Sequence, residues 1–165
     1  VYMTNLDCPF TAGLRMAKKL QAETDMVIVD FHAEATSEKQ ALAYHLNGYV
    51  SAVIGTHTHV QTADEQISKR GTAFICDAGM TGPYDSIIGM EKGPSLGRFI
   101  TGMPKRFTTA ADDVRLAGVI LRIDPTTGAT QEIERLMLNF DLVEYQNKRQ
   151  DMNEEGTQLD EQPAD

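Results

Sequence analysis

The chain has 165 residues, a formal net charge of −9 and two cysteines. This length suits one domain with its own core, and the 41% hydrophobic and 24% charged residues are ordinary for a globular protein. No apolar run approaches the roughly 18 residues of a membrane span, and the negative charge argues against a nucleic-acid backbone held by general electrostatics. Two cysteines are too few for a disulfide framework and no signal peptide is visible, so we expect a reducing, cytoplasmic setting.

The first half of the chain alternates predicted helices with predicted strands. After the end of a strand at residues 1–3, hydrophobic periodicity predicts a helix over 10–22, a strand over 26–31, a helix from about 37 to 47 and a strand over 49–55. Ser37 and Gln40 have the spacing of a capping box at the start of the second helix. A strand, a helix and a strand in this order form a βαβ unit, which makes the two strands parallel with a right-handed crossover.

The second half predicts mostly antiparallel strands. We expect, in chain order, a hairpin of residues 65–68 and 72–76, a long Gly- and Pro-rich loop over 77–93, a short helix over 94–101, and strands over 105–109, 116–123 and 130–138. Parallel α/β units followed by antiparallel strands indicate a layered α/β sandwich. This domain is expected to cover residues 1–142, followed over residues 143–165 by an acidic tail without apolar periodicity, which predicts disorder.

Histidines follow the ends of two predicted parallel strands. His57 and His59 stand just beyond the strand that ends at Gly55, and His32 ends the neighbouring strand. Ligands of open α/β sheets bind outside the carboxyl ends of the strands, and three imidazoles suit zinc, manganese or iron. The alternative is that one of His57 and His59 packs in the core while the other faces solvent. The presence of His32 at the end of the neighbouring strand favours a metal site instead. His45, inside the second helix, is interpreted as a surface or packing histidine.

Other residues near these histidines are weaker candidates for a role in the site. Asp30 precedes His32 by two residues, and we expect it to orient an imidazole rather than to bind metal. Asp77 ends an apolar strand, which makes it the best ligand candidate among the loop acids. Gly79 and Thr81 are candidate substrate-binding residues, since their backbone N–H groups could face a phosphate. A turn that needs positive φ is the simpler explanation of Gly79.

Three motifs in order carry a resemblance to a known family. They are residues 30–39, 53–64 and 77–83, and over about residues 1–142 the sequence resembles the YmdB-type metallophosphoesterases, a branch of the calcineurin-like two-metal phosphoesterases. The resemblance implies an α/β/β/α metallophosphatase sandwich. It also implies hydrolysis of a small phosphodiester such as 2′,3′-cyclic AMP with two divalent metal ions, iron or manganese first and zinc also possible.

The same resemblance assigns roles to the histidines. His32 and His57 would bind one metal and His59 the other, and the metals would activate a bridging water for in-line attack on phosphorus. Family members also carry an aspartate in a Gly-Asp turn, a bridging glutamate, an asparagine ligand and a histidine near the leaving group, in motifs that this sequence does not contain. The chain is therefore expected to be an incomplete, C-terminal portion of the sandwich, and its catalytic leaving-group histidine is unknown.

Two other functions stay open. As a catalytically inactive fragment, the chain would act as a binding or assembly module, and an uncovered sheet edge would favour a homo-oligomer. An amidohydrolase-type enzyme also places a His-x-His pair after a strand. Such sites need further histidines later in the chain, and none follows His59.

Overall fold

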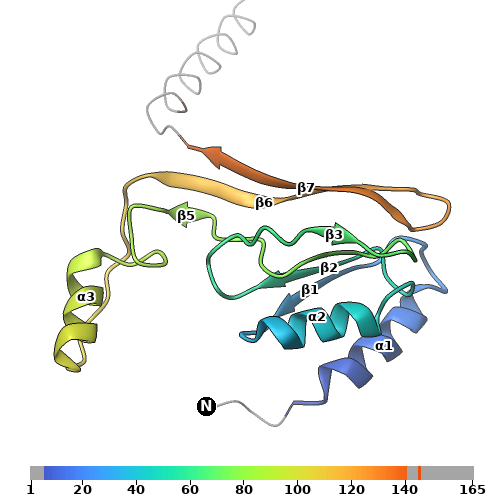
Figure 1. Ribbon diagram of the computed structural model, residues 1–165, viewed down its shortest axis with the longest axis horizontal. Coiled ribbons are helices and arrows are strands. Elements are labelled where there is room, and N and C mark those ends of the chain that lie inside the picture. The colour runs from blue at the N-terminus through green and yellow to red at the C-terminus, as the bar shows by residue number, and fades with distance from the viewer. Residues whose placement is uncertain (1–5, 141–144, 146–165) are drawn as a thin grey trace, which may run out of the picture.

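The computed structural model describes residues 6–140 and Tyr145. In this part of the chain two helices cover one face of a four-stranded sheet, and a long antiparallel hairpin lies on its other face (Figure 1). The mixed α/β class is thereby confirmed. The expected strand end at residues 1–3 and, Tyr145 excepted, the expected tail over residues 143–165 lie outside the described residues, so both stay predictions, as does the domain boundary between them.

The four-stranded sheet has the order β1-β2-β4-β3. Its strands and the two helices that cover it are α1 (Pro9–Leu20), β1 (Ile28–His32), α2 (Thr36–His45), β2 (Ala52–Thr56), β3 (Gln66–Ile67) and β4 (Ala73–Ile75). The strands β1, β2 and β4 are parallel, while β3 pairs antiparallel with β4. The predicted βαβ unit and the predicted short hairpin are both confirmed, and the parallel strands end at one edge.

The start of α2 differs from the predicted capping box. Its N-cap is Ala35, whose backbone is extended and whose side chain makes no capping hydrogen bond. Ser37 therefore lies inside the first turn, where its backbone is already helical, whereas a capping box needs the serine at the non-helical N-cap position. The capping prediction for Ser37 and Gln40 is wrong, although the predicted helix exists.

The second half of the chain forms β5 (Gly82–Pro83), α3 (Lys92–Thr101), β6 (Val114–Ile123) and β7 (Thr130–Asn139). The hairpin of β6 and β7 is confirmed, with β5 paired to its first strand. The strand expected over residues 105–109 is wrong. There, Thr109 makes an isolated bridge with Met90, and β propensity without a neighbouring ladder does not make a strand.

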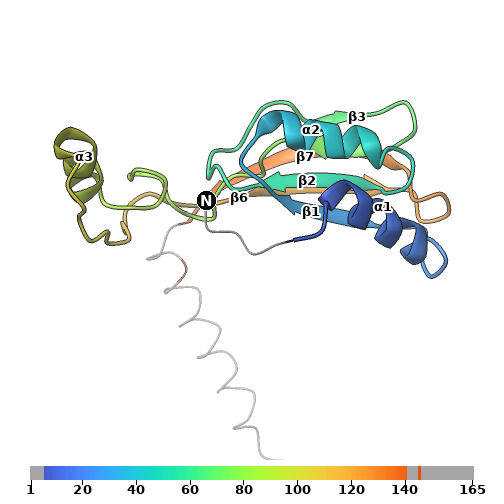
Figure 2. The ribbon, with the colours of Figure 1, turned by 90° about the horizontal axis from the view of Figure 1, so that it is seen from below.

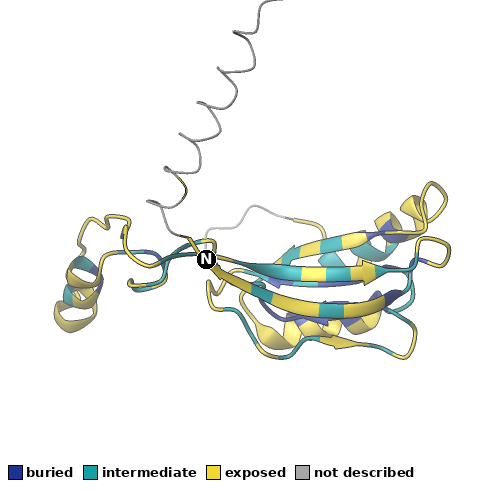
Figure 3. Ribbon diagram, turned by 90° about the horizontal axis from the view of Figure 1, so that it is seen from above, coloured by how far each residue is buried: buried dark blue, intermediate teal, exposed yellow. Residues whose placement is uncertain are grey.

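The outer face of the hairpin is open in the described residues. The helix α3 lies beyond the end of the layers rather than over them (Figure 2). Leu116, Ile120 and Leu138 are 44%, 51% and 53% exposed, and exposed positions recur along both strands of the hairpin (Figure 3). The described part of the chain therefore shows an α/β/β arrangement, and the fourth, helical layer of the expected sandwich is not among the residues it describes.

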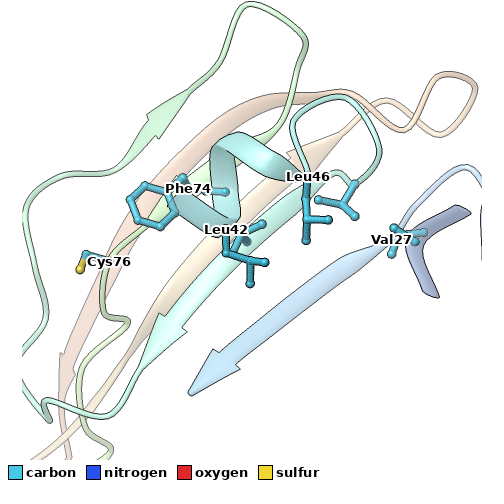
Figure 4. Close-up of a cluster of buried hydrophobic side chains, with 9 residues drawn as sticks. Val27, Leu42, Leu46, Phe74 and Cys76 are labelled. Carbon is cyan, nitrogen blue, oxygen red and sulfur yellow. The ribbon is translucent and has the colours of Figure 1, made fainter. Parts of the chain in front are cut away.

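The core lies between the helices and the sheet (Figure 4). Val53 and Ile75 have no exposed surface, because β2 and β4 are covered on both faces, as parallel strands usually are. Cys76 is 3% exposed and belongs to this core. Gly55 lets the ends of the strands approach, since a Cβ there would lie 1.8 Å from the Cys76 carbonyl oxygen. No helix among the described residues combines the length and apolarity that crossing a membrane requires.

Candidate metal centre

His32 and His57 meet at the carboxyl edge of the parallel sheet. In the register of β1 and β2, His32 lies opposite Thr56, so His57 follows directly beside it. The Nδ1 atom of His57 is 3.0 Å from Nε2 of His32, and the two rings make an edge contact with centroids 4.9 Å apart. Both side chains are exposed, so the pair faces solvent with its ring nitrogens converging.

A hydrogen-bonded chain orients the His32 ring. The Thr56 hydroxyl donates to the Asp30 carboxylate over 3.2 Å, so its oxygen accepts from Nδ1–H of His32 over 3.1 Å. In the neutral ring this arrangement places the proton on Nδ1 and aims Nε2 of His32 at His57, as in metal-binding histidines whose other ring N–H is held by a partner. Asp30 thus acts on the imidazole through Thr56. No motif singled out Thr56, although its place opposite His32 in the parallel pair was a usable signal.

His59 is held by a different segment. Its Nδ1 lies 2.9 Å from the carbonyl oxygen of Ile88, which accepts the ring N–H, so that in the neutral ring Nε2 is the nitrogen available to a metal. The structure therefore brings His32 and His57 together and ties His59 to the loop that follows β5. Within residues 6–140 and Tyr145, no three His, Cys, Asp or Glu side chains gather closely enough to hold one metal ion.

The backbone around these histidines is strained. His57 has a φ of +120°, His59 of +65° and Ile88 of +47°, in a region that side chains other than glycine rarely adopt. Each such residue costs about 1–3 kcal/mol and persists where its surroundings hold it in place. Such strain is typical of functional sites, and here it involves two of the three candidate ligands and the residue that binds the second of them.

Asp77 supports this loop from inside the protein. The side chain has no exposed surface, and its carboxylate accepts hydrogen bonds from the backbone N–H groups of Thr58 and Gly79 and from Lys39. Burial raises the pKa of Asp77, but these hydrogen bonds outweigh burial, and the pKa lies below the ordinary aspartate value. Sequence alone made Asp77 the best ligand candidate among the loop acids, whereas the structure engages its carboxylate entirely within the fold.

The candidate substrate-binding residues Gly79 and Thr81 make bonds within the chain. The Gly79 N–H donates to the Asp77 carboxylate over 3.0 Å, and its φ is +89°, which fits the explanation of Gly79 as a turn residue. The Thr81 hydroxyl donates to the carbonyl of Ala117 over 3.4 Å. The binding role of both residues stays a prediction.

Gln61 was not apparent from the sequence, yet it ties the histidine loop to the hairpin. Its side-chain nitrogen lies 3.2, 2.9 and 3.1 Å from the carbonyl oxygens of Ala78, Gly118 and Leu136. Because Gln61 follows His59 by two residues, these contacts anchor the loop on its far side. A lone glutamine carries no pattern, so the sequence offered no signal for this role.

His45 lies apart from the candidate centre, at the end of α2. Its side chain is exposed, and its ring centroid is 5.7 Å from that of Phe10, in a tilted contact between the two helices. The interpretation of His45 as a surface and packing histidine is confirmed.

The fold and the site define a class of protein. It is a layered α/β protein with converging histidines at the carboxyl edge of a parallel sheet, the place where open α/β sheets bind ligands. A family model described as YmdB-like protein matches residues 1–136. The chain belongs to this family, as the resemblance of its three motifs indicated.

Named relatives agree with this assignment. The chain is 47% identical over 140 residues to a 2′,3′-cyclic-nucleotide 2′-phosphodiesterase of Bacillus subtilis (strain 168), an alignment that covers 85% of this chain and 53% of the relative. A crystal structure of a hypothetical protein from Thermus thermophilus superposes with a TM-score of 0.77 at 42% identity, over 85% of this chain and 54% of that one. A novel phosphatase of Mycoplasma pneumoniae gives 0.74 at 37% identity, over 81% and 47%. The chain thus spans about half the length of these relatives.

Proposed function

We propose that this chain supplies part of the dinuclear metal centre of a phosphodiesterase that hydrolyses 2′,3′-cyclic nucleotides, such as 2′,3′-cyclic AMP, or related phosphodiesters. His32 and His57 bind one divalent ion and His59 the other, with iron or manganese as the first choices and zinc as the third. The converging pair of His32 and His57 carries the proposal, supported by the name of the Bacillus subtilis relative. The two cysteines, both free, suit a cytoplasmic enzyme.

The geometry of the pair fits a shared metal ion. The Nδ1 of His57 and the Nε2 of His32 are 3.0 Å apart, which is close enough for two imidazoles to share one ion. These two residues would hold a divalent ion in place of the hydrogen bond between their rings. Imidazole is a good ligand for zinc, iron and related ions.

In this proposal, other residues of the chain orient the rings of the histidine ligands. Thr56, backed by Asp30, keeps the proton of His32 on Nδ1, and Ile88 does the same for His59. The bound metals would activate water and polarise the phosphoryl oxygens for in-line attack on phosphorus. Two metals of this kind usually add bridging carboxylate and other oxygen ligands, so the three histidines are a partial ligand set.

The test compares His57→Ala with His45→Ala, a matched loss of one exposed histidine. We expect the wild-type chain and His45→Ala to bind Mn²⁺ and His57→Ala to lose it, as measured by metal analysis after gel filtration. Hydrolysis of 2′,3′-cyclic AMP with Mn²⁺ or Fe²⁺ is measured on the same samples, and any activity should disappear in His57→Ala. Equal metal content and equal activity in His57→Ala and wild type would refute the assignment.

A second candidate function rests on a different observation. Among the described residues, the outer face of the hairpin exposes Leu116, Ile120 and Leu138, and β1 lies at the edge of its sheet. Such surfaces favour a binding or assembly module, including a homo-oligomer. Light scattering after size exclusion tests this function, and a well-behaved monomer that nonetheless binds Mn²⁺ through His57 would count against it.

A further inference from the structure

We propose that Asp77, charge-balanced by Lys39, is the positioning residue that holds His57 and His59 in place. The consequence for metal binding rests on the function proposed above. The positioning itself is a property of the polypeptide, so it can be measured in the chain without any metal.

The carboxylate of Asp77 acts at the centre of the strained segment. Its Oδ2 atom accepts the backbone N–H of Thr58 over 2.8 Å. Thr58 lies between His57 and His59, whose φ values of +120° and +65° are both in the region that favours glycine. Without this acceptor the Thr58 N–H would turn toward water, and both histidines could relax to negative φ. The hydrogen bond and the strained backbone are therefore linked.

Asp77 is itself rigidly placed. Its other carboxylate oxygen, Oδ1, accepts the N–H of Gly79 over 3.0 Å. Its backbone N–H donates to the Thr62 hydroxyl over 2.9 Å, and its carbonyl accepts the Thr62 N–H over 3.1 Å. The two bonds with Thr62 connect the end of β4 to the segment that follows the histidine loop. The carboxylate therefore has one available position, and the loop must conform to it.

Lys39 supplies the compensating charge from α2. Its side chain has no exposed surface, and its ammonium is 3.1 Å from Oδ2 of Asp77. The side chain passes under Gly55, where a Cβ would come within 3.0 Å of the Lys39 Cδ. A buried carboxylate without a partner is costly and tends to take up a proton. Lys39 thus keeps Asp77 ionised and able to accept both backbone N–H groups.

The charge of Asp77 and its role in positioning the loop can be separated by substitution. A buried ion pair can often be replaced by neutral groups with little loss of stability. A leucine at position 77 has a similar size but no acceptor oxygen, so it would leave the N–H groups of both Thr58 and Gly79 without their partner. The paired replacement Asp77→Leu with Lys39→Met restores neutrality and removes both anchoring bonds.

The experiment measures this double variant against Thr130→Val. Thr130 is buried in another part of the fold, where its hydroxyl donates to the Ser51 carbonyl over 2.7 Å, so its loss lowers stability without touching the loop. Hydrogen exchange of the Thr58 amide is followed by NMR, and Mn²⁺ affinity by titration. We expect similar melting temperatures, with Thr58 exchange at least tenfold faster and Mn²⁺ binding about tenfold weaker in the double variant alone.

Each outcome decides between explanations. Unchanged Thr58 exchange in a folded double variant would overturn the positioning role. Faster Thr58 exchange in a chain whose wild type binds no Mn²⁺ would support the positioning role and refute the proposed metal function. If the double variant does not fold, the wild type still decides, because a bond from Thr58 to Asp77 gives a through-bond NMR coupling between the Thr58 nitrogen and the carboxyl carbon. Absence of that coupling overturns the proposal.

Discussion

The four-stranded sheet and the β6–β7 hairpin lie against each other but serve the candidate centre differently. The sheet has short strands, up to five residues long, that are largely buried in β2 and β4, and its carboxyl edge presents the histidine side chains. The hairpin has two ten-residue strands with an exposed outer face. Its described contacts with the site loops come mainly from backbone carbonyls, those of Ala117, Gly118 and Leu136.

The difference follows from strand direction and burial. Parallel strands end at the same edge, so residues that follow them converge, whereas antiparallel strands send successive ends to opposite edges. A strained loop also needs anchors that cannot yield, and the buried side of the sheet provides them in Asp77 and Lys39. The hairpin packs against the site loops and contacts them mainly through its backbone carbonyls. Single changes should therefore have large effects in the sheet and small effects at matched positions of the hairpin.

The largest expected contrast is between a buried and an exposed ion pair. Lys39→Met leaves the Asp77 carboxylate buried without a partner and should lower the free energy of unfolding by about 3–5 kcal/mol. Arg122→Met breaks the pair with Glu132 on the hairpin, where both side chains are more than half exposed, and should cost about 0.5 kcal/mol or less. Urea unfolding measures both, and similar losses would contradict the contrast.

A second contrast uses two glycines in strands. In Gly55→Ala the new Cβ would lie 1.8 Å from the Cys76 carbonyl oxygen, so β2 and β4 must separate, at a cost of about 3 kcal/mol. In Gly118→Ala the new Cβ meets nothing within 4 Å, and stability should stay within about 0.5 kcal/mol. Thermal unfolding checks both. A mild Gly55→Ala would mean that the strand ends can move apart freely.

Gln61 tests how far the hairpin supports the histidine loop. Gln61→Leu removes the donor to the carbonyls of Gly118 and Leu136 and should cost about 1–3 kcal/mol. Gln131→Leu, at an exposed hairpin position, is the control and should be nearly neutral. The hydrogen-exchange rate of the His59 backbone amide should rise in Gln61→Leu and stay unchanged in Gln131→Leu. An unchanged exchange rate there would show that the loop holds itself without the hairpin.

The smallest expected effect is a pH dependence. The pKa of Asp77 lies below its ordinary value, so this carboxylate contributes stability that is fully present above the ordinary aspartate pKa, about 3.9, and is lost as pH falls through the lower folded pKa. The free energy of unfolding should therefore fall more steeply below about pH 4 in the wild type than in the double variant Asp77→Leu with Lys39→Met.

A hairpin carboxylate is the control for that measurement. The hydrogen bond from Arg115 lowers the pKa of Asp113 against the opposing effect of burial, so the sign is the same. Its side chain is 38% exposed, and solvent screens it, so Asp113→Asn should change the acid profile less than the double variant does. If the free energy of unfolding fell equally with pH in the wild type and in the double variant, Asp77 would not be the source of the acid dependence.

The sequence by itself determined the family and most of the order of elements. The period of apolar residues distinguishes helices from strands locally, so the βαβ unit, the short hairpin and the pair β6–β7 could all be predicted. The segment over residues 105–109 could not, because a strand exists only when another strand supplies its hydrogen bonds. His32, His57 and His59 could be chosen because they follow strand ends, which is a pattern along the chain.

The tertiary structure decided most of what holds those histidines in place. The bond from Thr56 to Asp30, the contact of His59 with Ile88 and the pair of Lys39 with Asp77 join segments that are 26, 29 and 38 residues apart. The place of Asp30 two residues before His32 indicated an orienting role, but Ile88 and the pair of Lys39 with Asp77 leave no period or motif in the sequence. In addition, burial reverses the apparent role of Asp77. From its place after a strand, Asp77 is a possible metal ligand. In the fold, however, its side chain has no exposed surface and lies beside the Lys39 ammonium, so it supports the loop instead.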